Sequence, residues 1–177
     1  MNRRHLAVLA VLSAGILCNA WSGEETGPER LDGVHRVSEG IYRGPQPCPE
    51  LLRKMAELGV RTVVSLRSES EAAEEEESAA AAAGLRFFRI GLSGLGRPPD
   101  ESIREVLEAI TSSANQPVFV HCKRGADRTG VAVACYRIGH EGWSVEEAMA
   151  EAKGHGLGWW QLGMKRFIRD SCGEALD

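Results

Sequence analysis

Hydrophobic positions along the chain form two patterns, short apolar runs and longer stretches with helical spacing. The β-branched-rich run at residues 60–66 and the short apolar run at 118–120 predict two buried strands, and residues 85–90 predict a further strand. Residues 35–37 and 41–43, separated by Ser-Glu-Gly, predict a hairpin near the start of the folded region. The sequence therefore predicts a sheet of four to five strands.

Helical patterns alternate with these strands. Pro49 opens the first helix and Gly59 stops it, while Ser144 with Glu147 forms a capping box for a later one. The predicted helices cover residues 49–58, 69–83, 102–110, 129–140, 144–149 and 160–168, with Ser102 and Glu105 as a second capping box. Strands alternating with helices indicate an α/β fold with a mostly parallel sheet.

The N-terminus has a different pattern. Arg3 and Arg4 precede an apolar run at residues 6–18, and Ala20 follows as a small residue suited to cleavage. We expect residues 1–20 to be an export signal, 21–33 a linker and 34–173 one domain; the alternative is a buried N-terminal helix. The mature protein is then expected to be exported, periplasmic or secreted if bacterial, with no stable membrane anchor.

The acidic excess of the chain is confined to one short stretch of the sequence. The net charge of the 177 residues is −4, which argues weakly against a nucleic-acid partner. Loss of Arg3 and Arg4 with the signal makes the mature chain −6. The acidic excess lies in one run, Glu69, Glu71 and Glu74 to Glu77. We predict that this run is a solvated helix face, far from any catalytic residue.

The candidate chemistry lies between the strand at 118–120 and the following helix. Cys122 ends the strand region, and the loop after it directs backbone N–H groups and the positive end of a helix dipole at one point. Such surroundings lower the pKa of a thiol and favour the nucleophilic thiolate. Arg128 is suited to bidentate phosphate binding, Gly125 to close backbone approach, and Thr129 to donation toward the sulfur. His121 is expected to orient the loop.

These residues read H-C-K-R-G-A-D-R-T-G, which resembles the C-x5-R signature of the cysteine-based protein tyrosine phosphatases. Y-R-G-P-Q-P at 42–47 and V-V-S-L-R at 63–67 are similar to elements of the atypical dual-specificity phosphatases of bacteria, plants and fungi. The resemblance covers residues 34–169. It implies a phosphatase-like sandwich, catalytic Cys122 and Arg128, and substrate binding by Lys123, Arg124, Gly125, Ala126 and Gly130.

The implied reaction is hydrolysis of phosphomonoesters through a thiophosphate on Cys122, without a metal or organic cofactor. Substrates left open are phosphotyrosine or other phosphoprotein, inositol polyphosphate or pyrophosphate, and phosphoinositide. Lys123 and Arg124 suit a ligand with several phosphates. The alternative class is a phosphate-binding module without turnover.

A general acid is not evident from the sequence. The family usually has an Asp about thirty residues before the cysteine, and Leu92 stands there. Asp127, within the loop, and Asp100, after a Gly/Pro-rich segment, are the two candidates, and Asp127 is slightly favoured. Each also has a structural interpretation, as a loop hydrogen-bond acceptor and as a first-turn helix acid.

A few other residues carry weaker expectations. Trp159 and Trp160 are expected to pack under the last helix, or else to wall the pocket, and Arg67 and Arg97 to be surface residues or to reach the rim. Cys48, Cys135 and Cys172 are candidates to trap oxidised Cys122 as a disulfide. The cysteines have no C-x-x-C spacing, so no zinc site is indicated.

Overall fold

The computed structural model describes residues 27–68 and 71–172. Five strands form one sheet in the order β1-β2-β5-β3-β4. Its members are β1 (His35–Ser38), β2 (Ile41–Pro45), β3 (Thr62–Ser65), β4 (Arg86–Arg89) and β5 (Val118–Cys122). β1 and β2 form the antiparallel hairpin, while β2, β5, β3 and β4 run parallel. The predicted α/β fold with a mostly parallel sheet is confirmed.

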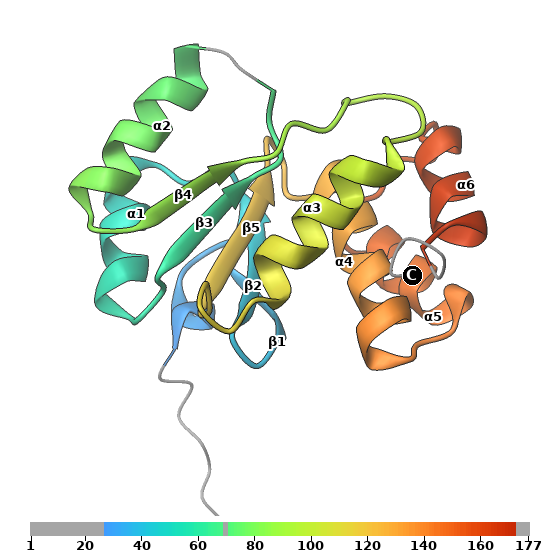
Figure 1. The fold of residues 1–177 in the computed structure, drawn as a ribbon, viewed down its shortest axis with the longest axis horizontal. Coiled ribbons are helices and arrows are strands. Elements are labelled where there is room, and N and C mark those ends of the chain that lie inside the picture. Colours follow the sequence, from blue (N-terminus) through green and yellow to red (C-terminus); the bar gives the residue numbers. More distant parts are fainter. Residues whose placement is uncertain (1–26, 69–70, 173–177) are drawn as a thin grey trace, which may run out of the picture.

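Helices cover both faces of this sheet. The helices are α1 (Pro49–Glu57), α2 (Glu71–Ala82), α3 (Asp100–Thr111), α4 (Asp127–Glu141), α5 (Val145–Gly154) and α6 (Leu162–Asp170), with a 3-10 turn at Pro28–Arg30. Figure 1 shows α1 and α2 on one side of the sheet and α3 to α6 on the other. Neighbouring strand residues point to opposite faces, so each strand contributes to both cores. Val63 and Phe119 pack with α1 and α2, whereas Val64 and Val120 pack with α3, α4 and α6.

Helix starts agree with the sequence in one case and not in another. Ser144 and Glu147 form the predicted reciprocal capping box of α5. The capping box predicted at Ser102 is wrong, because α3 begins at Asp100, directly after the extended Pro99. Asp100 and Glu101 then occupy the first turn, where carboxylates interact favourably with the helix dipole.

A disulfide joins α4 to the end of α6. Cys135 and Cys172 are bonded across 37 residues of sequence. Closing a loop of this length stabilises a fold by about 4 kcal/mol in the chain-entropy account. The expectation that these two cysteines trap oxidised Cys122 is therefore wrong, since each is the other's partner. Cys48 is free and exposed, and Cys122 is free and buried.

The expected export signal and residues 21–26 of the expected linker lie outside the described residues. Within the described part of the chain, none of the helices has the length and apolar character to span a bilayer.

Candidate active site

Cys122 lies at the carboxyl end of β5, the central strand. It pairs in register with Pro45 of β2, and the preceding His121 pairs with Ser65 of β3. Both neighbouring strands run parallel to β5, so their carboxyl ends meet at the same edge of the sheet. Ligands of open α/β sheets bind at this edge. Packing between the two strands leaves the Cys122 side chain only 3% exposed.

The loop after Cys122 is tightly packed against β2. Gly125 has a φ of +69°, and a Cβ added to it would lie 2.4 Å from the carbonyl carbon of Gly44, so only glycine fits there. Arg43 of β2 is buried, and its Nη2 donates to the Gly125 carbonyl oxygen over 2.9 Å. Burial lowers the pKa of Arg43 to about 10, against the nearby charges of Glu151 and Cys122, which raise it. Arg43 belongs to the Y-R-G-P-Q-P motif, but its contact with the loop was not predicted from the sequence.

No side chain caps the helix that follows the loop. The N-cap of α4 is Ala126, which has no side-chain hydrogen bond to offer. The first N–H groups of a helix have no partner within the helix, and they carry the positive end of its dipole. The loop and the start of α4 therefore form a site suited to an anion such as phosphate.

Several contacts hold the Cys122 thiol in a state that favours ionisation. Burial raises its pKa, but the neighbouring Thr129 hydroxyl, the main-chain N–H groups of Thr129 and Arg124, and the charge of Arg128 lower it more. The net result is a pKa below the ordinary value of a thiol. A cysteine in these surroundings is suited to nucleophilic attack.

Arg128 is positioned from two other elements. Its Nη1 donates to the main-chain oxygens of Leu66, after β3, and Leu92, after β4, over 3.2 and 3.5 Å. These contacts hold the half-buried guanidinium close to the Cys122 thiol, whose pKa its charge lowers. A planar guanidinium can bind two oxygens of a phosphoryl group at once.

Asp127 has both carboxylate oxygens occupied. Oδ1 accepts from the Gly158 N–H over 2.8 Å, and Oδ2 accepts from Arg124 Nη2 over 2.5 Å. The residue is 7% exposed. These bonds tie the phosphate-binding loop to the segment between α5 and α6.

Asp100 is exposed in the first turn of α3. Its two oxygens accept from Nη2 and Nη1 of Arg97 over 2.7 and 2.9 Å, and this hydrogen-bonded pairing lowers the pKa of Asp100. Arg97 also lies over the Phe167 ring at 4.8 Å. Asp100 is thus engaged with Arg97, and Arg97 also contacts α6.

Cationic and aromatic side chains border the loop. Lys123 and Arg124 are exposed, and the Arg124 guanidinium carbon lies 6.0 Å from the centre of the Trp160 ring. Trp159 is 79% and Trp160 47% exposed, so the expectation that this pair packs under the last helix is wrong. Both residues precede α6, which begins at Leu162.

One residue near Cys122 was missed by the sequence analysis. Glu76 of α2 is 4% exposed, and its Oε1 lies 2.6 Å from Nε2 of the buried His121. The prediction that the whole Glu-rich run is solvated and far from catalysis is therefore wrong at this position. Glu75 and Glu77 on either side are exposed as expected. Sequence alone offers no signal for the exception, because Glu76 stands among identical residues.

Within residues 27–68 and 71–172, no three His, Cys, Asp or Glu side chains lie close enough together to hold a metal ion.

Comparison with known proteins agrees with the geometry of this site. A family model described as "DSP-PTPase phosphatase fused to NAD+ Kinase" matches residues 26–170. Inositol diphosphatase DSP1 of rice is 37% identical over 105 residues, which make up 57% of this chain and 47% of that protein. Dual specificity protein phosphatase TpbA of Pseudomonas aeruginosa is 27% identical over 164 residues, 86% of this chain and 72% of that protein. The chain spans about half the length of the rice relatives that it matches.

Solved structures give the same result. The core catalytic domain of the PP-IP phosphatase SIW14 from Saccharomyces cerevisiae has a TM-score of 0.69 and 26% identity, covering 77% of this chain and 83% of that one. TpbA in complex with pTyr has a TM-score of 0.66 and 26% identity, covering 78% and 83%. Because the family model covers most of the chain and the fold and loop agree with it, this chain belongs to the DSP-PTPase phosphatases, the atypical dual-specificity family that its motifs resemble.

Proposed function

We propose that this chain is a cysteine-dependent phosphatase that hydrolyses phosphomonoesters. The observation that carries the proposal is the position of one thiol, Cys122, at the centre of a loop built to bind phosphate. Its pKa is lowered by the Thr129 hydroxyl, by loop N–H groups and by Arg128. Family membership and the named activities of the relatives support the same reaction class.

In the proposed reaction the Cys122 thiolate attacks phosphorus, forming an S–P bond as the ester P–O bond breaks. The departing oxygen leaves with the electron pair and takes up a proton. Arg128 and the loop N–H groups bind the phosphoryl oxygens, whose charge they stabilise in the transition state. Water then attacks phosphorus, the S–P bond breaks, and the thiolate is restored with the help of the Thr129 hydroxyl.

Hydrolysis of p-nitrophenyl phosphate by the purified protein at pH 5–7, with a chelator and a mild reducing agent, tests this proposal. The thiolate fraction rises with pH, and the lowered pKa of Cys122 places this rise below the pH at which an ordinary thiol ionises. We therefore expect activity on the acid side of neutrality that vanadate inhibits. Phosphate binding without turnover would favour the alternative, a phosphate-binding module. Activity that the chelator abolishes would contradict both the cysteine-dependent phosphatase and the binding module.

Replacement of Asp127 with asparagine tests the role of this carboxylate. Since both oxygens accept hydrogen bonds, we expect loss of loop order and a drop in kcat of about tenfold on aryl and alkyl phosphates alike. A general acid has a different signature, because only the poor alkyl leaving group needs its proton. Loss confined to alkyl phosphates would therefore assign the acid role to Asp127. Asp100→Asn, measured on the same aryl and alkyl phosphates, tests the other candidate for the general acid in the same way.

Inositol polyphosphates or pyrophosphates are the second candidate substrates. The exposed cations Lys123 and Arg124 on the loop suit a ligand with several phosphates, and the rice relatives and SIW14 are named for this activity. Side-by-side kcat/KM values for a phosphotyrosyl peptide and an inositol pyrophosphate would distinguish the two classes. A clear preference for the peptide would rule against this candidate.

We also propose that the protein works in an oxidising compartment after export. The N-terminal pattern of the sequence supports this, and so does the Cys135–Cys172 disulfide, because structural disulfides persist mainly outside the cytosol.

A further inference from the structure

Glu76 is a buried carboxylate that the proposed reaction does not use. Its neighbours on α2, Glu75 and Glu77, are exposed, whereas Glu76 points toward the sheet. A carboxylate is strongly disfavoured in a protein interior unless charged or hydrogen-bonding partners surround it. The position of Glu76 therefore depends on what it contacts.

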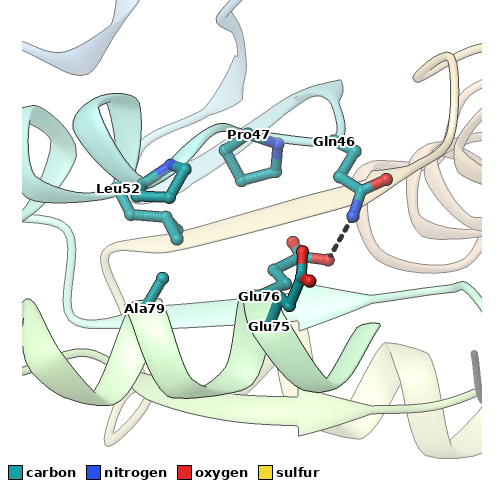
Figure 2. A pocket seen from close by; sticks show the side chains of 7 residues that line it. Gln46, Pro47, Leu52, Glu75, Glu76 and Ala79 are labelled. Atoms are coloured by element: carbon teal, nitrogen blue, oxygen red, sulfur yellow. Dashed lines mark hydrogen bonds between the residues drawn. The ribbon is translucent and has the colours of Figure 1, made fainter. Parts of the chain in front are cut away.

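Those contacts form a chain of side chains from four separate parts of the fold. Glu76 Oε1 lies 2.6 Å from His121 Nε2, and Glu76 Oε2 accepts from Gln46 Nε2 over 3.0 Å. The Gln46 amide oxygen accepts in turn from Nη1 of Arg67, which follows β3. Figure 2 shows the Gln46 amide hydrogen-bonded to the Glu76 carboxylate. Both residues line a pocket of about 140 Å³ together with residues of α1 and α2.

The His121 ring connects this chain to the nucleophile. Nε2 faces the Glu76 carboxylate, and Nδ1 lies 3.4 Å from the main-chain oxygen of Cys122. Each ring nitrogen thus has an oxygen atom close to it, one on α2 and one on the main chain of the nucleophile. The Phe119 ring stacks on the imidazole at 5.6 Å and restricts its rotation.

We propose that Glu76, held by Gln46, is a positioning residue: it orients His121, which fixes the main chain of Cys122 where β5 turns into the phosphate-binding loop. The inference rests on the proposed function and adds to it a residue 46 positions before the nucleophile. With the junction fixed, the thiol stays within reach of the Thr129 hydroxyl and of the loop N–H groups. Small displacements of a reacting group lower rates strongly, so support of this kind has a measurable effect on turnover.

Glu76→Gln, with Glu75→Gln as the matched control, tests the proposal. Both variants lose one negative charge from adjacent positions lining the same pocket, but only Glu76 contacts His121. All variants carry Cys48→Ser, because Cys48 is the other free cysteine in the described part of the chain. The measurements are kcat and KM for p-nitrophenyl phosphate and the rate of Cys122 alkylation by iodoacetamide as a function of pH.

We expect Glu76→Gln to lower kcat about tenfold or more with KM changed much less, and to move the alkylation profile to higher pH. Glu75→Gln should match the parent. A pure charge effect has the opposite sign, because removal of an anion favours the thiolate and moves the profile to lower pH. A shift to lower pH, or values equal to those of Glu75→Gln, would overturn the proposal.

A double-mutant cycle with His121→Gln tests whether Glu76 acts through the ring. In that background we expect Glu76→Gln to have no further effect, whereas an equal additional loss would contradict the proposed route. If Glu76→Gln does not fold, Gln46→Met takes its place, with a smaller kcat loss and the same upward shift expected; parent-like values would overturn the proposal. If the parent has no phosphatase activity, the proposed function fails, and the alkylation profiles still decide the role of Glu76.

Discussion

Cys122→Ser is expected to abolish hydrolysis of p-nitrophenyl phosphate, with kcat falling by roughly 10⁴-fold or more. The Thr129 hydroxyl, the loop N–H groups and the charge of Arg128 lower the pKa of the thiol and favour its ionisation. A serine hydroxyl at the same place stays protonated at the working pH and is a far weaker nucleophile. Initial rates of nitrophenol release, measured for the variant beside the parent, check this.

Cys48→Ser is the natural control for that experiment. Cys48 and Cys122 are the two free cysteines of the described residues, but Cys48 is exposed at the start of α1. We expect its loss to leave kcat unchanged. Phosphate should still bind to Cys122→Ser, because the loop N–H groups and Arg128 are retained. Full activity in Cys122→Ser would exclude the thiol mechanism and with it the proposed function.

Arg128→Lys is expected to lower kcat by about 10²- to 10³-fold. Lysine keeps the positive charge but not the planar fork that binds two phosphoryl oxygens together. It also cannot reproduce the guanidinium geometry set by the main-chain oxygens of Leu66 and Leu92. The kinetics of p-nitrophenyl phosphate hydrolysis and the affinity for inorganic phosphate measure the two parts of this loss.

Arg124→Lys provides the comparison within the same loop. Arg124 is exposed and pairs with Asp127, and the positive charge that lysine retains keeps most of the local field. We expect a much smaller effect on kcat than for Arg128→Lys. Equal losses in the two variants would mean that the loop responds to general disturbance, and Arg128 would lose its special role in the transition state.

The sequence predicted the elements of the fold well because their signals are local. Apolar runs marked β3 and β5, a run with two phenylalanines marked β4, and Pro49 marked the start of α1. The capping box of α5 was predicted because its two residues, Ser144 and Glu147, lie three positions apart in the sequence. The start of α3 was predicted at Ser102, two residues too late. Pro99 with Asp100 is a second possible helix start, and the sequence alone does not show which of the two start signals is used.

The residues of the candidate site also fall into two groups, those that a local pattern predicts and those that only the strand order brings together. Cys122, Gly125, Arg128 and Thr129 lie within eight consecutive residues, so their proximity follows from one loop and one helix start. Arg43 reaches Gly125 across 82 positions, and Arg128 reaches Leu66 across 62. Contacts of this kind depend on strand order, which places β2 and β3 on either side of β5. No periodicity within the chain specifies that order.

The strand–loop–helix that holds Cys122 and Arg128 could be predicted from the sequence, because a phosphate-binding loop is made of neighbouring residues. The side chains that support this loop became evident only when the elements were packed together. Glu76 is indistinguishable in sequence from Glu75 and Glu77, yet the rotation of α2 against the sheet buries this one carboxylate beside His121. The exposure of Trp159 and Trp160 was likewise evident only from the tertiary structure. Burial is a property of the assembled layers, and it is therefore set by contacts between residues far apart in the chain.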